Sequence, residues 1–223
     1  VEVAELPLSV PEEDLISVIK AKNADISVHG ILLFRPLPKH LKLDNIKLFI
    51  APEKDVDCMG EINTARVFSG EKDCFPPCTA QAVIEILDFY NIPLTGKKAV
   101  VVGRSMVVGR PLSMLLLNKN ATVTICHTKT ENLPEECRKA DILVACAGSA
   151  GMIGREYTNP AQTVIDVGIN FKDGKLCGDV DFCDVAEHVH SITPVPGGVG
   201  TVTTAVLLKH TVISAQRLYN QNH

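Results

Sequence analysis

Long apolar runs are absent from this sequence of 223 residues. No stretch reaches the roughly 18 consecutive apolar residues that a membrane-spanning helix needs, which argues against a membrane protein. The opening residues Val1-Glu2-Val3 also lack the basic start and the apolar stretch of a signal peptide. We therefore expect a cytoplasmic protein that has no membrane partner.

An excess of positive charge is also lacking. The 22 Lys and Arg residues are outnumbered by 26 Asp and Glu residues, so the net charge of −4 argues against a nucleic-acid binder. The 8 cysteines include no Cys-x-x-Cys pair, and we expect reduced thiols, with no metal site and no disulfide framework. The apolar content of 46% is enough for a real core in one large or two modest domains.

Strand-like apolar runs alternate with helix-like segments along the chain. Strands are expected at residues 1–6, 28–34, 99–102, 121–126, 142–146 and 164–168. Helices are expected from Pro11, over 40–50, 79–89, 109–117 and 134–139, and over 203–218, after a loop at 192–200. This alternation predicts an α/β fold with a parallel sheet and right-handed crossovers.

Residues 97–130 have the pattern of a mononucleotide-binding βαβ unit: an apolar strand, a glycine turn, a helix and a second strand. Gly103 lets the chain turn without a Cβ clash, and Gly109 lets the helix lie close to the strand. Free N–H groups at the helix start would then face a pyrophosphate. The usual dinucleotide fingerprint is missing, because Ser105 and Val108 replace its second and third glycines.

The second strand of this unit ends without an acidic residue. NAD-binding units usually carry Asp or Glu there to hold the ribose 2′-hydroxyl, whereas this chain has Cys126-His127-Thr128-Lys129. The turn residue Arg104 suits an adenosine 2′-phosphate, which a carboxylate would repel. The pattern favours NADP over NAD, and the alternative is a plain βαβ crossover with a solvated arginine.

An ordered set of motifs carries a family resemblance. The motifs are GILLFRPLPKHL (30–41), PEKDVD (52–57), VVVGRSMVVGRP (100–111), CHTKT (126–130), DVGIN (166–170), GDVDF (178–182) and ITPVPGGVGTVT (192–203). Together they resemble the bifunctional methylenetetrahydrofolate dehydrogenase/methenyltetrahydrofolate cyclohydrolase family over nearly the whole chain. The resemblance implies that NADP⁺ takes a hydride from 5,10-methylenetetrahydrofolate and that water then opens the methenyl ring to give 10-formyltetrahydrofolate.

The same resemblance implies an architecture and a cellular role. A Rossmann-like parallel-sheet NADP domain would cover residues 76–200, and a folate-side α/β domain would cover 1–75 together with 201–223. The substrate would lie in a cleft between the two domains. The protein would form a homodimer through the nucleotide domain and serve one-carbon metabolism, including purine, histidine and methionine biosynthesis.

The resemblance also implies which residues form the site. NADP would contact Gly103, Arg104, Ser105, Thr128 and Ile169. The tetrahydrofolate substrate would contact Leu33, Phe34, Arg35, Asp57, Pro196, Gly197, Gly198, Val199 and Gly200. Asp57 would be the catalytic residue, because a carboxylate can accept two N–H donors from a pterin edge. Read without the family, Asp57 is a surface acid, residues 196–200 are an ordinary connection and Ile169 is a core residue.

The sequence departs from the family pattern in several places. No Tyr-x-x-x-Lys motif, whose lysine serves ring opening in the family, is present, and we expect it upstream of Val1. Phe34 replaces a glutamine and Cys58 a glycine, while Thr201-Val202 replaces Pro-Met. A Cβ at Cys58 strains the loop if that position needs a positive φ. Two alternatives therefore stay open: a non-catalytic folate- or nucleotide-binding domain, and another small-molecule dehydrogenase on the same scaffold.

Overall fold

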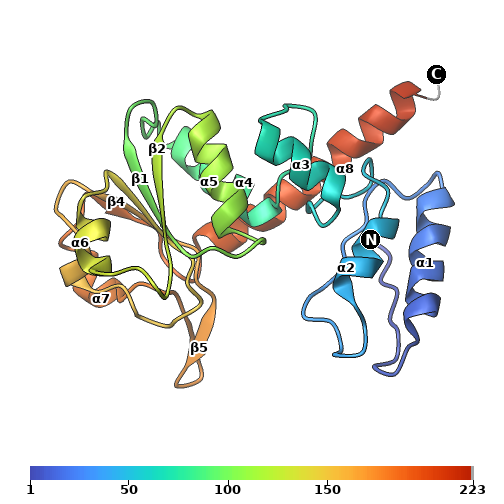
Figure 1. Ribbon diagram of the computed structural model, residues 1–223, viewed down its shortest axis with the longest axis horizontal. Coiled ribbons are helices and arrows are strands. Elements are labelled where there is room, and N and C mark those ends of the chain that lie inside the picture. The colour runs from blue at the N-terminus through green and yellow to red at the C-terminus, as the bar shows by residue number, and fades with distance from the viewer. Residues whose placement is uncertain (222–223) are drawn as a thin grey trace. The chain divides into compact units, whose positions relative to one another are not determined.

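The computed structural model describes residues 1–221 and divides into two compact units (Figure 1). The first unit comprises Val1–Pro76 and Leu207–His223, and the second comprises Pro77–Val206. Together they form a mixed α/β protein with a parallel sheet, so the predicted fold class is confirmed.

The second unit is built on a five-stranded parallel sheet of order β2-β1-β3-β4-β7. Its strands are β1 (Lys98–Val102), β2 (Thr122–Cys126), β3 (Ile142–Ala145), β4 (Thr163–Asp166) and β7 (Ser191–Ile192). The register pairs Val102 with Cys126 and with Ala145, and Ala145 with Asp166. The loops that follow β1, β2, β3 and β4 therefore leave the sheet at one edge, where ligands of open α/β sheets bind.

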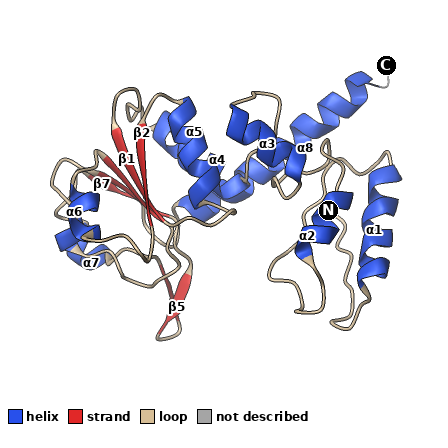
Figure 2. Ribbon diagram, in the orientation of Figure 1, coloured by secondary structure: helices blue, strands red, loops and turns tan. Residues whose placement is uncertain are grey.

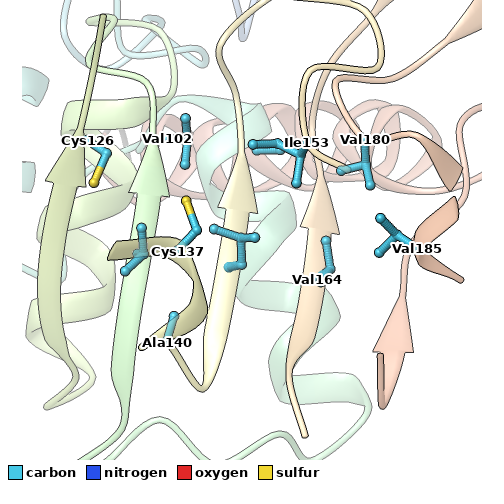
Figure 3. Close-up of a cluster of buried hydrophobic side chains, with 11 residues drawn as sticks. Val102, Cys126, Cys137, Ala140, Ile153, Val164, Val180 and Val185 are labelled. Atoms are coloured by element: carbon cyan, nitrogen blue, oxygen red, sulfur yellow. The ribbon is translucent and has the colours of Figure 1, made fainter. Parts of the chain in front are cut away.

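Helices cover both faces of this sheet, as Figures 1 and 2 show. On one side lie α4 (Cys78–Phe89) and α5 (Gly109–Asn118), and on the other α6 (Leu133–Arg138) and α7 (Phe182–Val185). Cys137 of α6 and Val185 of α7 pack on strand residues such as Val102 and Val164 (Figure 3). The β-branched runs form the central strands because both faces of a parallel sheet are buried. The 3-10 helix η2 (Arg155–Tyr157) and the hairpin β5 (Asn170–Lys172) and β6 (Lys175–Cys177) complete the unit.

The first unit is mainly helical. It contains α1 (Glu12–Ala24), α2 (Leu43–Ile46), the 3-10 helix η1 (Lys47–Phe49) and α3 (Glu61–Ser69), and α8 (Val199–Gln221) begins in the second unit and ends here. Apolar residues of α1, α2 and the segments around them form its core, among them Leu15, Ile19 and Ile46. No helix within residues 1–221 is long and apolar enough to cross a membrane.

Several elements differ from the sequence-based prediction. The expected strands at 1–6 and 28–34 are wrong: of these residues only Ile31 forms a bridge, to Asp55. A strand is stable only when a partner completes its ladder, and neither segment has one among the described residues. The helix expected over 40–50 is reduced to α2 and η1, and α4 begins at Cys78 rather than being capped by Thr79. The helix α3 and the β5–β6 hairpin were not predicted.

Candidate functional site

Neighbouring backbone packs closely on the turn after β1, as Gly103 and Gly109 predicted. Gly103 has a φ of 142°, and a Cβ on it would overlap the Cys146 carbonyl and lie 2.7 Å from the Cys146 Sγ. A Cβ on Gly109 would overlap the Gly103 carbonyl, because the start of α5 packs directly on the turn. The Gly103 N–H also donates to the Cys126 carbonyl at 2.9 Å, which ties the turn to the end of β2. The steric reason given for both glycines is confirmed.

Ser105 shapes the start of α5. The Val108 N–H donates to the Ser105 Oγ at 3.1 Å, and the Arg110 N–H donates to the Ser105 carbonyl at 3.0 Å. The hydroxyl oxygen is the acceptor in the first bond, so its own O–H can donate to a ligand oxygen. The exposed serine thus lies beside the first turn of a helix, where backbone N–H groups favour an anion.

Cationic and hydroxyl side chains lie after β1 and β2 at the same sheet edge. Arg104 is exposed and forms no ion pair within residues 1–221. After β2, the His127 N–H donates to the Thr130 Oγ1 at 2.8 Å and the Lys129 N–H donates to the His127 Nδ1 at 3.1 Å. This tight turn makes His127 structural and leaves Thr128 exposed. A cation and a hydroxyl with no carboxylate between them fit the 2′-phosphate of NADP.

Ile169 lies at the same edge, directly after β4. Its side chain is 65% exposed, so the alternative of a core residue is wrong. Gly168 and Asn170 on either side of it are both held by hydrogen bonds to buried carboxylates. The structure therefore presents an apolar side chain to solvent from a fixed stretch of backbone, an arrangement that suits a contact with an apolar ligand edge.

Asp57 lies in the first unit within a loop that is partly buried. An Arg35 Nη2 lies 3.5 Å from the Asp57 Oδ2, and both side chains are largely shielded, with 27% and 18% exposed. The structure thus brings together two of the predicted substrate residues. The alternative of a surface acid in a solvated loop does not fit this shielded position.

Sequence reasoning missed the buried carboxylate that shapes the Asp57 loop. Asp55 is 1% exposed and accepts hydrogen bonds from the Met59 N–H at 2.8 Å, the Gly60 N–H at 2.9 Å and the Asn63 Nδ2 at 3.1 Å. Burial raises the pKa of Asp55 above its usual value. Residue type alone does not distinguish a solvated acid from one buried under backbone N–H groups, so residues 52–57 had the pattern of an ordinary polar loop.

Lys54 anchors the same loop on its other side. Its buried ammonium donates to the carbonyls of Lys22 at 3.1 Å, Asn23 at 2.7 Å and Asp25 at 2.7 Å. These carbonyls lie at the C-terminal end of α1, where unpaired acceptors and the helix dipole both favour a cation. The loop that carries Asp57 is therefore fixed to α1 by Lys54 and to α3 by Asp55.

Cys58 adopts a left-handed backbone conformation, which is the condition under which its Cβ strains the loop. Its φ is 55°, and its Sγ lies 3.8 Å from the Thr64 Oγ1. Burial raises the pKa of its thiol to about 12, so the thiol stays protonated at neutral pH. The position needs a positive φ, and the Cβ of Cys58 is a source of strain next to Asp57.

We expect a pair of substitutions to isolate this strain. Cys58→Ala keeps the Cβ, whereas Cys58→Gly removes it, so the glycine variant should be more stable than the alanine variant by about 1 kcal/mol. Urea midpoints of the two variants measure the difference, and comparing them cancels the loss of the thiol, which both share. An alanine variant at least as stable as the glycine variant would show that the Cβ costs nothing here.

The other predicted substrate residues have different surroundings. Leu33 packs against the core of the first unit, whereas Phe34 is exposed. The loop expected at 192–200 is shorter, because β7 ends at Ile192 and α8 begins at Val199. Val199 is buried, so its side chain is not available to a ligand, and residues 196–200 offer mainly backbone, including the N–H groups at the start of α8.

The first unit also has a hollow that contains none of the predicted residues. It has a volume of about 220 Å³. Its lining comes from η1, the following loop and the start of α3: Lys47, Leu48, Ile50, Pro52, Asp55, Gly60, Glu61, Ile62 and Asn63. The predicted substrate residues of this unit therefore lie outside the hollow.

Comparisons with family models match both units. The model described as "Tetrahydrofolate dehydrogenase/cyclohydrolase, NAD(P)-binding domain" matches residues 77–219. The model for the catalytic domain of the same family matches residues 1–57. The two matches cover most of the chain, and the NAD(P)-binding match covers the second unit and continues over residues 207–219 of α8.

Individual relatives agree with the family models. The chain is 54% identical over 220 residues to the bifunctional protein FolD of Clostridioides difficile, covering 98% of this chain and 76% of the relative. It is also 54% identical to the FolD of Carboxydothermus hydrogenoformans, covering 97% of this chain and 77% of the relative. The chain thus spans about three quarters of these proteins.

Solved structures give the same result for the fold. The bifunctional FolD of Campylobacter jejuni matches with a TM-score of 0.92 and 43% identity, over 94% of this chain and 75% of that one. The dehydrogenase-cyclohydrolase of Trypanosoma brucei, complexed with NADP cofactor and inhibitor, matches with a TM-score of 0.90 and 37% identity. That match covers 96% of this chain and 75% of the Trypanosoma chain.

Proposed function

The chain belongs to the tetrahydrofolate dehydrogenase/cyclohydrolase family, and from this premise we propose which of its residues bind the cofactor and the substrate. The protein is a bifunctional enzyme that oxidises 5,10-methylenetetrahydrofolate with NADP and hydrolyses the resulting methenyl compound to 10-formyltetrahydrofolate. Bound NADP supplies the hydride acceptor. The roles of individual residues that follow are proposals.

The single observation that carries the NADP assignment is the glycine turn after β1 with the exposed cation Arg104. Gly103 keeps the turn free of side-chain bulk, and the Ser105 hydroxyl can donate to a pyrophosphate oxygen. Arg104 and Thr128 hold the 2′-phosphate through charge-assisted hydrogen bonds. Ile169 contacts the nicotinamide end of the cofactor. The close packing of Gly103 and Gly109 and the exposure of Arg104 support this assignment.

The substrate assignment rests on the fixed loop around Asp57. The Asp57 carboxylate accepts N–H donors from the pterin edge, and the nearby Arg35 orients that carboxylate through their 3.5 Å contact. Leu33 and Phe34 contribute apolar contacts, and residues 196–200 contribute backbone. The anchoring of this loop by Asp55 and Lys54 supports the role of Asp57, because a binding group must be held in place.

Three further proposals concern the roles of the two units, the oligomeric state and the cellular compartment. We propose that the second unit is the NADP domain and the first the folate-side catalytic domain, supported by the separate family matches. We also propose a homodimer formed through the second unit, supported by exposed apolar side chains at the ends of α4 and α5: Phe89, Tyr90 and Leu117. The free cysteines of the described chain support a reducing compartment, the cytoplasm, and the reaction places the enzyme in one-carbon metabolism.

The activity test uses the full-length protein and one matched pair of variants. We expect 5,10-methylenetetrahydrofolate and NADP⁺ to yield reduced nicotinamide, followed by its absorbance. Asp57→Asn should lower kcat/KM by about 10–100-fold, because a hydrogen bond to a charged group contributes ~1.5–3 kcal/mol. Asp44→Asn, at an exposed acid of the same unit, should leave the rate unchanged.

Two outcomes would contradict these expectations. A wild-type protein that binds folate or NADP⁺, seen as a shift in melting temperature, but reduces neither NADP⁺ nor NAD⁺ would be a non-catalytic binding domain. An active wild type whose Asp57→Asn variant matches Asp44→Asn would leave the enzyme assignment intact and remove Asp57 from the substrate site.

A further inference from the structure

Two sequence motifs contribute only Ile169 to the site as described so far, and their acidic residues have no role yet. The motifs are DVGIN at 166–170 and GDVDF at 178–182, and each contains one deeply buried carboxylate. Asp166 is 3% exposed and Asp179 is 0% exposed. Buried carboxylates are costly unless hydrogen bonds satisfy them, so both must be held by specific donors.

Asp166 joins the end of β4 to the GDVDF segment. Its Oδ1 accepts the N–H groups of Gly168 and Asp179, both at 2.9 Å, and its Oδ2 accepts the Val180 N–H at 3.0 Å. Burial raises the pKa of Asp166. A Cβ on Gly178 would overlap this carboxylate, which explains the glycine before Asp179. The segment that carries Asp179 is therefore fixed against the end of the sheet.

Asp179 in turn joins the loops that follow β3 and β4. Its Oδ2 accepts the Ala147 N–H at 2.6 Å and the Gly148 N–H at 2.9 Å. Its Oδ1 accepts the Ser149 N–H and the Asn170 Nδ2, both at 2.9 Å. One carboxylate thus fixes three successive backbone groups of one loop and a side chain of the other.

Both joined loops contact the proposed NADP residues. The loop after β3 begins with Cys146, whose carbonyl and Sγ pack on Gly103 of the phosphate-binding turn. The loop after β4 carries the exposed Ile169 between Gly168 and Asn170, and a Cβ on Gly168 would overlap Asp179. The same carboxylate therefore supports the backbone next to the proposed pyrophosphate turn and next to the proposed nicotinamide contact.

We propose that Asp179 is a positioning residue for NADP, which acts through Asn170 to fix Ile169 and through residues 147–149 to support the Gly103 turn. This inference rests on the proposed role of Ile169 and Gly103 in binding the cofactor. Asp179 itself is fully buried, so its role is to hold the loops and not to contact the substrate. How firmly the loops are held in one conformation determines how well a bound cofactor is oriented.

The test compares a direct variant with a milder one. Asp179→Asn places an amide N–H₂ where two backbone N–H groups need an acceptor, while Asn170→Ala removes only the link to the loop after β4. Asn159→Ala is the matched control. The Asn159 Nδ2 also donates hydrogen bonds, to the Arg138 and Ala140 carbonyls instead of a carboxylate, and Asn159 lies before β4, at the opposite edge of the sheet. Calorimetric titration with NADP⁺ and both enzyme activities are measured for each full-length variant.

We expect the Kd for NADP⁺ to rise about tenfold in Asn170→Ala and about 10–100-fold in Asp179→Asn, as for hydrogen bonds to charged groups. Dehydrogenase kcat/KM should fall with it, whereas the cyclohydrolase step, which needs no NADP, should stay close to wild type. Asn159→Ala should leave the Kd unchanged. If Asp179→Asn does not fold, the Asn170→Ala titration still decides the question.

Different failures separate this inference from the proposed function. Parallel falls in both activities at an unchanged Kd would make the carboxylate merely structural and overturn the inference. An unchanged Kd in both variants would overturn it as well. A wild-type protein that neither binds NADP⁺ nor turns over would instead contradict the proposed function.

Discussion

Gly103→Ala should destabilise the second unit by about 4 kcal/mol, which is the sum of two costs. It should also abolish dehydrogenase activity, because the substitution distorts the proposed phosphate-binding turn. A residue with a Cβ at a φ of 142° is strained, which costs ~1–3 kcal/mol. The added Cβ would also overlap the Cys146 carbonyl, and forcing extra atoms into a packed site costs another ~1–3 kcal/mol. Denaturant unfolding measures the stability change, and reduction of NADP⁺ measures the activity.

Gly200→Ala is the matched control for stability. No atom lies within 4 Å of a Cβ at Gly200, which is in the first turn of α8, so this variant should be as stable as wild type or up to about 1 kcal/mol more stable. A Gly103→Ala protein with a wild-type unfolding midpoint would show that the turn relaxes without cost. It would also remove the steric argument for the phosphate-binding turn.

Arg104→Glu should have the largest effect on cofactor choice. The substitution removes a charge-assisted hydrogen bond to the 2′-phosphate, worth ~1.5–3 kcal/mol, and adds like-charge repulsion. We expect kcat/KM with NADP⁺ to fall by about 10²–10³-fold, while kcat/KM with NAD⁺, which lacks the phosphate, changes by no more than about threefold. Steady-state rates with both cofactors give the ratio directly.

The control for this prediction is an arginine elsewhere in the second unit. Arg155 lies in η2 and is exposed, so Arg155→Glu makes the same charge change away from the proposed cofactor residues. Arg155→Glu should leave the ratio of kcat/KM with NADP⁺ to kcat/KM with NAD⁺ unchanged. Equal losses with NADP⁺ and NAD⁺ in Arg104→Glu would place this arginine on the shared pyrophosphate and not on the 2′-phosphate.

In each unit a buried carboxylate holds the loop that carries a proposed ligand-binding residue. Asp55 in the first unit and Asp179 in the second are buried carboxylates that collect backbone N–H groups from a loop. In each case a neighbouring residue of that loop system, Asp57 or Ile169, is the one proposed to contact a ligand. Burial strengthens such hydrogen bonds, so the loop keeps one conformation without help from a regular strand or helix.

The sequence alone determined the parts that depend on local pattern. The βαβ unit, its two glycines and the missing acid after β2 could be interpreted without coordinates, because side-chain size and backbone freedom are properties of single residues. The motifs identified the family for a similar reason, because their residues and their order can be seen in the sequence without coordinates. In the structure Arg104 is exposed in that turn, and Cys58 has the positive φ that the sequence raised only as a condition.

Only the tertiary structure decided which polar residues are buried and what they hold. Asp55, Asp166 and Asp179 look like ordinary loop acids in the sequence, yet each is buried and accepts backbone N–H groups, some from segments distant in the chain. The apolar segments 1–6 and 28–34 likewise resembled strands but lack ladder partners among the described residues. Burial and strand pairing are relations between segments, so the composition of one segment cannot determine them.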